Sequence, residues 1–222
     1  MQPVECVLFD CDGTLVDSEI LCCESFSIVF NHYGIPLSTQ ECVLRFKGTN
    51  LYQVFAEVRK EYELAQSDEQ LEKEYRQNMA VLFEQRLEPI DGVRSLLEGI
   101  TVPMAVVSNG PVSKMQHSLG LTHLLDFFGE RLYSAFDIQR WKPDPALLAF
   151  ACGGLNVELE KCILVEDSVS GANAGIAAGI AVFYYCADPH SHPIHHPLVT
   201  PFYHMNELPA LWKARGWNIY QG

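Results

Sequence analysis

Two aspartates separated by one residue follow the first apolar segment of the chain. Val4–Phe9 runs directly into Asp10, Cys11 and Asp12, and Gly13 then allows a tight turn. Carboxylates this close repel each other unless a cation or a shared proton relieves the repulsion. Mg²⁺ prefers a few carboxylate oxygens and keeps positions open for water and phosphate. The pair therefore suits metal-assisted phosphate chemistry, with a polar helix-capping loop as the alternative for an isolated motif of this kind.

A hydroxyl and an amide end a second apolar segment, at Ser108 and Asn109. Both side chains are suited to hydrogen-bond a phosphoryl oxygen, and an ordinary turn is the alternative for this pair. Further along the chain, Lys142 precedes Pro143, and Pro145 follows two residues later. Two prolines restrict the backbone more than a solvated lysine needs. Lys142 is thus a candidate to neutralise charge, with a surface lysine as the alternative.

A second acidic pair, Glu166 and Asp167, follows a third apolar segment, and small residues come directly after it. The alternative to a functional site here is a helix N-cap, a role that Asp167 or Ser168 can also serve.

The elements that carry these residues alternate between strand and helix. The apolar runs predict buried strands, and the stretches between them have helical spacing. Such alternation indicates a mostly parallel sheet covered on both faces, with the ligand site at the carboxyl ends of the strands. The expected strands are Val4–Phe9, Pro103–Val107, Cys162–Val165 and Ala181–Cys186, and the expected helices are Gly92–Ile100, Pro145–Cys152 and Val169–Ala178.

A long helical segment interrupts this alternation after the first strand. Helices are expected over Glu19–His32, Leu51–Glu63 and Asp68–Gln85, and no strand is apparent among them. Because this segment is far longer than an ordinary strand-to-helix connection, it indicates an inserted domain. We therefore expect an α/β core made of residues 1–15 and 87–222, and a helical domain of residues 16–86.

Composition narrows the class of protein. The chain has 222 residues, 48% of them apolar, and a formal charge of −13. This charge makes nucleic acid and anionic membranes poor partners. The first ten residues lack the pattern of a signal peptide, and no apolar run is long enough to cross a bilayer. Of the eight cysteines, Cys6, Cys162 and Cys186 lie in apolar runs, so reduced thiols and a cytoplasmic location are expected.

Taken together and in this order, the four motifs closely resemble those of the haloacid dehalogenase superfamily of phosphotransferases. The resemblance covers essentially the whole chain and implies a Rossmann-like α/β core with an inserted helical cap. It implies that Asp10 is the nucleophile and that Asp12 is the general acid and base.

The resemblance also implies how metal and phosphate are held. Mg²⁺ would be bound by Asp10, by the backbone carbonyl of Asp12 and by Asp167, with Glu166 close by or as an occasional ligand. The transferring phosphoryl group would be held by Ser108, Asn109 and Lys142. Positioning and electrostatic stabilisation of this kind supply most of the catalysis in phosphoryl transfer.

Further residues indicate which reaction of the superfamily to expect. Dehalogenases and phosphonate hydrolases lack an acid at the position of Asp12, so hydrolysis of a phosphate ester is favoured. A cap favours a small phosphorylated metabolite, and Lys47, with Arg45, could meet an anionic substrate in the cap loop; a solvated loop charge is the alternative for Lys47. The segments Arg140–Pro145, Cys186–His190 and Trp212–Trp217 resemble a bacterial phosphatase of a sugar-acid phosphate.

Two other functions remain open. The runner-up is a sugar phosphomutase, but the cap histidine and arginine of those enzymes are replaced by Cys22 and Leu51. A non-catalytic binding protein would be expected to lose the acids and Lys142, which are all present. We expect a monomer or a weak homo-oligomer. The histidine-rich segment Asp188–Pro197 is expected to be a surface loop, and Trp212–Trp217 a C-terminal helix.

Overall fold

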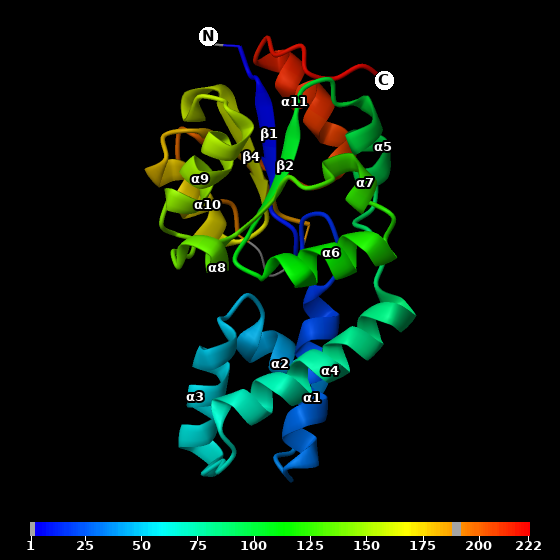
Figure 1. Cartoon of the computed structure of the whole chain (residues 1–222), viewed down its shortest axis with the longest axis vertical. Coiled ribbons are helices and arrows are strands. Elements are labelled where there is room, and N and C mark those ends of the chain that lie inside the picture. The colour runs from blue at the N-terminus through cyan, green and yellow to red at the C-terminus, as the bar shows by residue number, and fades with distance from the viewer. Residues whose placement is uncertain (1–2, 188–191) are drawn as a thin grey trace. The chain divides into compact units, whose positions relative to one another are not determined.

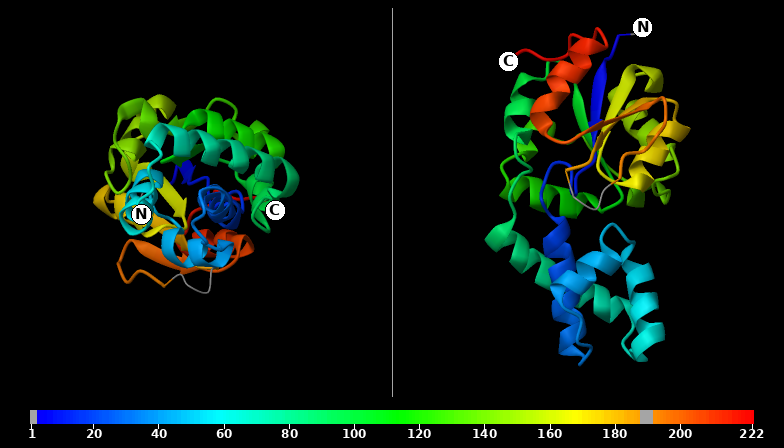
Figure 2. Two further views of the ribbon diagram at one scale, coloured as in Figure 1. Left: turned by 90° about the horizontal axis from the view of Figure 1, so that it is seen from below. Right: turned by 180° about the vertical axis from the view of Figure 1, so that it is seen from behind.

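The computed structural model describes residues 3–187 and 192–222, and the chain forms two compact units (Figures 1 and 2). The core unit consists of Met1–Val16 and Pro89–Gly222, and the helical unit is Asp17–Glu88. These borders differ by one to two residues from those expected. Val16 belongs to the core because it forms isolated β-bridges with Asp12 and with Pro89.

A six-stranded sheet with the order β3-β2-β1-β4-β5-β6 forms the centre of the core unit, and every strand pairing is parallel. This confirms the α/β class with a parallel sheet. The strands are β1 (Cys6–Phe9), β2 (Met104–Ser108), β3 (Leu132–Ser134), β4 (Cys162–Glu166), β5 (Ala181–Tyr185) and β6 (Val199–Phe202).

Helices cover both faces of this sheet, as Figure 1 shows. They are α5 (Val93–Gly99), α6 (Val112–Leu121), α7 (Leu125–Phe128), α8 (Ala135–Ile138), α9 (Ala146–Leu155), α10 (Val169–Ala177) and α11 (Leu208–Ala214), with short 3₁₀ helices η1 (Leu159–Lys161) and η2 (Met205–Glu207).

Alternate residues of the strands face opposite layers, which fixes the strand register. On one face, Leu8 of β1 and Leu164 of β4 pack with buried residues of α9 and α10. On the other face, Phe9 meets Phe128 of α7 edge to face at 6.1 Å, and Phe183 of β5 meets Trp212 of α11 in the same geometry at 6.1 Å. Burial on both faces explains why the central strands are continuously apolar.

The helical unit contains α1 (Glu19–His32), α2 (Thr39–Phe46), α3 (Leu51–Tyr62) and α4 (Asp68–Arg86). Phe26 of α1 lies at the centre of its aromatic core. The ring stacks on Tyr75 of α4 at 4.5 Å and meets Phe46 and Phe55 edge to face at 6.0 and 6.3 Å. Aromatic contacts at these distances stabilise the packing beyond the burial of area alone.

Several elements were not expected from the sequence, among them helices α6, α7 and α8, two edge strands and helix α2. Strands β3 and β6 lie at the edges of the sheet, have three and four residues, and β6 contains Pro201, which edge strands tolerate. Helix α2 has a sequence signal that was overlooked: Ser38 and Glu41 form a capping box at its start.

Other expectations concern the C-terminal half and the cysteines. The C-terminal helix is α11, which ends before Trp217, and Trp217 contacts Phe183 at 6.2 Å. The prediction of reduced cysteines agrees with eight free thiols. Within the histidine-rich segment, residues 188–191 lie outside the described part of the chain, and 192–197 form no regular element. Across the described residues, no helix is long and apolar enough to cross a membrane.

Candidate active site

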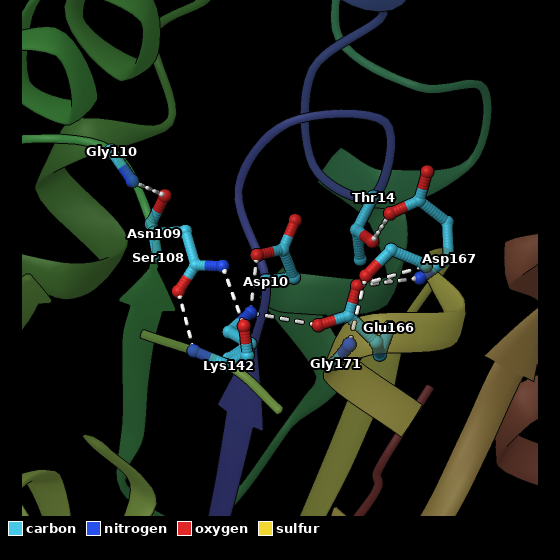
Figure 3. Close-up of polar contacts among 10 residues, drawn as sticks. Asp10, Thr14, Ser108, Asn109, Gly110, Lys142, Glu166, Asp167 and Gly171 are labelled. Atoms are coloured by element: carbon cyan, nitrogen blue, oxygen red, sulfur yellow. Dashed lines mark hydrogen bonds and ion pairs between the residues drawn. The ribbon is translucent and has the colours of Figure 1, made fainter. Parts of the chain in front are cut away.

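The predicted site residues of the core unit gather at the carboxyl ends of three adjacent strands (Figure 3). Phe9, the last residue of β1, pairs with Val106 of β2 and with Val165 of β4. The residues that follow these positions therefore emerge side by side. They are Asp10 and Asp12 after β1, Ser108 and Asn109 at the end of β2, and Glu166 and Asp167 at the end of β4.

Lys142 brings a positive charge into this cluster from the loop between α8 and α9. Its Nζ lies 2.6 Å from Asp10 Oδ1 and 2.7 Å from Glu166 Oε2. The side chains of Lys142, Asp10 and Glu166 are 2%, 11% and 0% exposed. Buried charges are tolerated only when they are paired and hydrogen-bonded, so one ammonium bridging two carboxylates is the condition that allows these acids to be buried.

The environment shifts the pKa values of this bridged set. Burial raises the pKa of Asp10, repulsion from Glu166 raises it further, Lys142 opposes both, and the pKa reaches about 7. Burial alone would lower the pKa of Lys142, but attraction by Asp10 and Glu166 outweighs it and raises the pKa above its ordinary value. Lys142 thus stays charged. A further cation near Asp10 would stabilise the ionised form of its carboxyl group.

Glu166 is held from three directions. Its Oε1 accepts hydrogen bonds from the backbone amides of Asp167 at 3.1 Å and Ser168 at 2.9 Å, while Oε2 receives Lys142. Gly171 leaves the space that this carboxylate needs, because a Cβ at that position would lie 1.7 Å from Glu166 Oε2. The small residue after the acidic pair is therefore a steric requirement of the site.

Asp167 lies against the loop that follows β1. Its Oδ1 accepts a hydrogen bond from the Thr14 hydroxyl at 3.0 Å. Gly13 has a φ of +79°, and a Cβ there would lie 2.1 Å from Asp167 Oδ2. Both the backbone conformation and the close approach require glycine. This contact joins the first and the fourth motif, which lie 153 residues apart.

Three carboxylates of the cluster can converge on one cation. Within residues 3–187 and 192–222, the only group of three or more metal-ligating side chains is Asp10, Glu166 and Asp167, whose ligand atoms lie within 4.8 Å of one another. An all-oxygen, acidic donor set fits a hard divalent cation such as Mg²⁺. The described histidines of the 192–197 segment do not form such a group.

Asp12 is paired with a residue that the sequence did not single out. Lys114 of α6 places its Nζ 2.8 Å from Asp12 Oδ1, and the two side chains are 17% and 21% exposed. The acid expected to transfer protons thus has a cation of its own, separate from Lys142. The backbone carbonyl of Asp12, and not its side chain, remains the predicted metal ligand.

Ser108 and Asn109 are organised by their neighbours. Ser108 is 2% exposed, and its hydroxyl oxygen accepts a hydrogen bond from the Gly110 amide at 3.0 Å. The Asn109 side chain accepts from the backbone amide of Lys142 at 2.8 Å and donates to its carbonyl at 3.3 Å. In this structure the Asn109 side chain therefore holds the Lys142 segment, and its contact with phosphate stays a prediction.

Lys47 and Arg45 belong to the helical unit. Lys47 caps the C-terminus of α2 and is half-buried. Arg45 forms ion pairs with Glu57 at 2.7 Å and with Glu61, and its guanidinium lies 4.8 Å above the Phe46 ring. Two carboxylates of its own unit thus engage the guanidinium, and a contact of Arg45 with substrate stays a prediction.

The sequence did not indicate Lys114, Thr14 or the close approach of Gly13 and Gly171 to carboxylates. The neighbours of Gly13 and Gly171 in sequence gave a partial signal, since each glycine lies beside an acidic motif. Lys114 gave none: it is a lysine in the first turn of an amphipathic helix, where a solvated charge is the ordinary expectation. Only the fold places it beside Asp12.

Fold and site together define a parallel α/β core with an acidic cluster at the carboxyl ends of its central strands, and comparison with known proteins identifies its family. Residues 7–185 match the family model described as haloacid dehalogenase-like hydrolase. The chain therefore belongs to the haloacid dehalogenase-like hydrolase family, which confirms the resemblance seen in the sequence.

Individual relatives place the chain among the phosphatases of this family. It is 52% identical to the 6-phosphogluconate phosphatase of Escherichia coli K12, over 99% of both chains. It is 33% identical to the validoxylamine A 7'-phosphate phosphatase of Streptomyces hygroscopicus subsp. limoneus, over 78% of this chain and 81% of the relative. A family hydrolase from Deinococcus radiodurans, solved with phosphate and sodium, superposes with a TM-score of 0.77 at 26% identity, over 97% and 98% of the two chains. The predicted enzyme class, a phosphatase, is confirmed.

Proposed function

We propose that this protein hydrolyses the phosphate ester of a small sugar or sugar acid, with Mg²⁺ as cofactor and an aspartyl-phosphate at Asp10 as intermediate. The observation that carries the proposal is the buried Lys142 ammonium, which lies 2.6 Å from Asp10 Oδ1 and 2.7 Å from Glu166 Oε2. This arrangement holds a carboxylate at a strand end beside a fixed positive charge, as attack on a phosphoryl group requires.

In the first step, a carboxylate oxygen of Asp10 attacks phosphorus and the bond between phosphorus and the ester oxygen breaks. The ester oxygen takes a proton from Asp12, so the alcohol leaves neutral and Asp12 becomes a carboxylate. Asp12 follows Asp10 by two residues in a turn that Gly13 closes. Nucleophile and acid are therefore supplied by one loop.

In the second step, water attacks phosphorus and the bond to the Asp10 oxygen breaks. The proton lost by the water passes to Asp12, which restores its acid form, and inorganic phosphate leaves. Asp12 serves both steps because the proton that it donates in one is recovered in the other.

Asp10, Glu166 and Asp167 would hold Mg²⁺, together with the backbone carbonyl of Asp12. When bound, this cation neutralises charge on the phosphoryl oxygens and on the crowded carboxylates. Lys142 supplies a second fixed positive charge, and Ser108, at the end of β2, supplies a hydroxyl. The Asn109 side chain serves this set by fixing the Lys142 backbone.

The substrate proposed is 6-phosphogluconate or a related sugar-acid phosphate, because the chain is 52% identical over 99% of its length to a phosphatase named for that compound. We propose that the helical unit acts as the cap and that Lys47 pairs with the carboxylate of the substrate. We further propose a cytoplasmic enzyme that is a monomer or a weak homo-oligomer.

Release of inorganic phosphate from 6-phosphogluconate and other sugar phosphates tests the proposal. Activity is expected with Mg²⁺, and its loss is expected in EDTA. Asp10→Asn should lower kcat by about 10³-fold or more, because it removes the nucleophile. Asp137→Asn is the matched control, since Asp137 is an exposed aspartate of α8. Full activity in EDTA or in Asp10→Asn would contradict the mechanism.

The phosphomutase alternative is tested in the same assay. A sugar 1-phosphate is supplied with the corresponding bisphosphate, and the products are separated by chromatography. Isomerised sugar phosphate formed faster than inorganic phosphate would show a mutase.

A further inference from the structure

Lys114 is a half-buried cation that has no part in the proposed mechanism as described above. It lies in the first turn of α6, and its Nζ is 2.8 Å from Asp12 Oδ1. Lys142, by contrast, is committed to Asp10 and Glu166. The two aspartates of the first motif therefore have different cationic partners, which come from different segments of the chain.

The surroundings of Gly110 locate Lys114 relative to the site. A Cβ built on Gly110 would lie 3.4 Å from Ser108 Oγ, 3.5 Å from Lys114 Cδ and 3.9 Å from Asp12 Oδ2. Gly110, the second residue after β2, therefore lies close to the Lys114 stem, the Ser108 hydroxyl and the Asp12 carboxylate.

Helix α6 holds Lys114 in a defined place. The Lys114 amide donates to the Pro111 carbonyl at 3.0 Å, and the Lys114 carbonyl accepts from the Ser118 hydroxyl at 2.9 Å. The next residue, Met115, is 1% exposed and anchors this turn in the core. A side chain presented from a packed helix positions its partner more accurately than one from a mobile loop does.

Exposed ion pairs contribute little to stability, but this pair is about four-fifths buried, at 17% and 21% exposed. Its partner is the residue that exchanges protons in both proposed steps. We propose that Lys114 is a positioning residue: its ammonium holds the Asp12 carboxyl group where it meets the leaving oxygen of an ester bound at Asp10. This inference rests on the proposed function, and Lys114 itself neither gains nor loses a proton.

Comparison of two leaving groups tests the inference. 6-Phosphogluconate is an alkyl ester, whose leaving oxygen needs a proton, whereas p-nitrophenyl phosphate releases a stabilised phenolate that needs none. In Lys114→Met, kcat for 6-phosphogluconate should fall by about 10²-fold, the usual contribution of general acid catalysis, with little change in KM. Release of p-nitrophenol in the first turnover should fall by less than about tenfold.

Two further variants serve as controls for this comparison. Lys114→Arg keeps the charge and should restore part of the lost kcat. Gln116→Met changes an exposed residue of the same helix and should behave as wild type. Thermal melts identify any variant that is unfolded, and Lys114→Gln replaces Lys114→Met if the latter does not fold.

Several outcomes would overturn the inference. One is an equal loss for the two esters, and another is a raised KM with unchanged kcat, which would make Lys114 a substrate ligand. A crystal structure of Lys114→Met with Asp12 in its original position would also overturn it, whatever the activity. If wild-type protein releases phosphate from neither ester, the proposed function fails first, and this inference fails with it.

Discussion

The side chain of Asn109 binds both backbone groups of Lys142. Its Oδ1 accepts from the Lys142 amide at 2.8 Å, and its Nδ2 donates to the Lys142 carbonyl at 3.3 Å. The residue after β2 thereby fixes the segment that delivers the bridging ammonium, although 33 residues separate the two. In the proposed mechanism, the Asn109 amide therefore acts through the placement of Lys142.

Replacing Asn109 should consequently impair catalysis through Lys142. We expect Asn109→Ala to lower kcat by about 10–100-fold, because a small displacement of a catalytic group has a cost of this order. Asn109→Asp keeps the oxygen that accepts from the Lys142 amide but loses the donor to the Lys142 carbonyl. Its kcat should therefore also lie below that of the wild type. Asn218→Ala, which changes an exposed asparagine near the C-terminus, is the control. Steady-state kinetics measure the effect, and wild-type kcat in Asn109→Ala would contradict the assignment.

Removal of the bridging ammonium should destabilise the fold as well as the reaction. Lys142→Met leaves Asp10 and Glu166 buried without their shared partner. Breaking a buried charge pair on one side costs about 3–5 kcal/mol in the free energy of unfolding. Urea denaturation in EDTA measures this loss, with Lys213→Met, an exposed lysine of α11, as the control. Equal midpoints for Lys142→Met and wild type would refute the bridging role.

A single methyl group at Gly171 should disturb the acidic cluster. The new Cβ would lie 1.7 Å from Glu166 Oε2, so either the carboxylate or α10 has to move. We expect Gly171→Ala to cost about 1–3 kcal/mol of stability, as overpacking does, and to weaken metal binding. Gly153→Ala is a matched control in α9, because nothing lies within 4 Å of its Cβ position. Thermal melts and metal titration compare the two, and similar behaviour would show that the close contact has no consequence.

Metal affinity should depend on pH through Asp10. Because burial and Glu166 raise the pKa of Asp10 to about 7, a proton competes with a cation for this carboxyl group near neutrality. Affinity for Mg²⁺ should therefore fall as the pH drops from 8 to 6, by up to about tenfold per pH unit below the pKa. Isothermal titration calorimetry measures the affinity. A constant affinity over this range would contradict a titrating Asp10.

The same raised pKa has a consequence for stability without metal. The folded pKa lies above the ordinary value of 3.8, so ionisation of Asp10 opposes folding progressively from about pH 4 to 7 and fully above pH 7. In EDTA, Asp10→Asn should thus be more stable than wild type above pH 7, and this advantage should disappear near pH 4. Melting temperatures across that range measure the difference, and an advantage that grows at low pH would reverse the sign expected.

Much of the fold follows from local patterns in the sequence. Continuous apolar runs predicted the central strands β1, β2, β4 and β5, because parallel strands buried on both faces need them. Helical periodicity predicted α1, α3 and α4. The edge strands β3 and β6 were missed, since three or four residues carry no periodic signal and β6 also contains a proline. Pairing with a neighbouring strand defines them, and that is a tertiary property.

For the site, the sequence alone determined the chemical types and the strand ends from which they project: Asp10, Asp12, Ser108 and Asp167 follow apolar runs that were predicted to be strands. The strand order, which makes these three strands neighbours, came from the tertiary structure. Only the tertiary structure decided the pairings among charges: Lys142 with Asp10 and Glu166, and Lys114 with Asp12. The reason is physical. Burial and adjacency along a strand are encoded locally, whereas the partner of a charge depends on the three-dimensional placement of residues up to 132 positions apart.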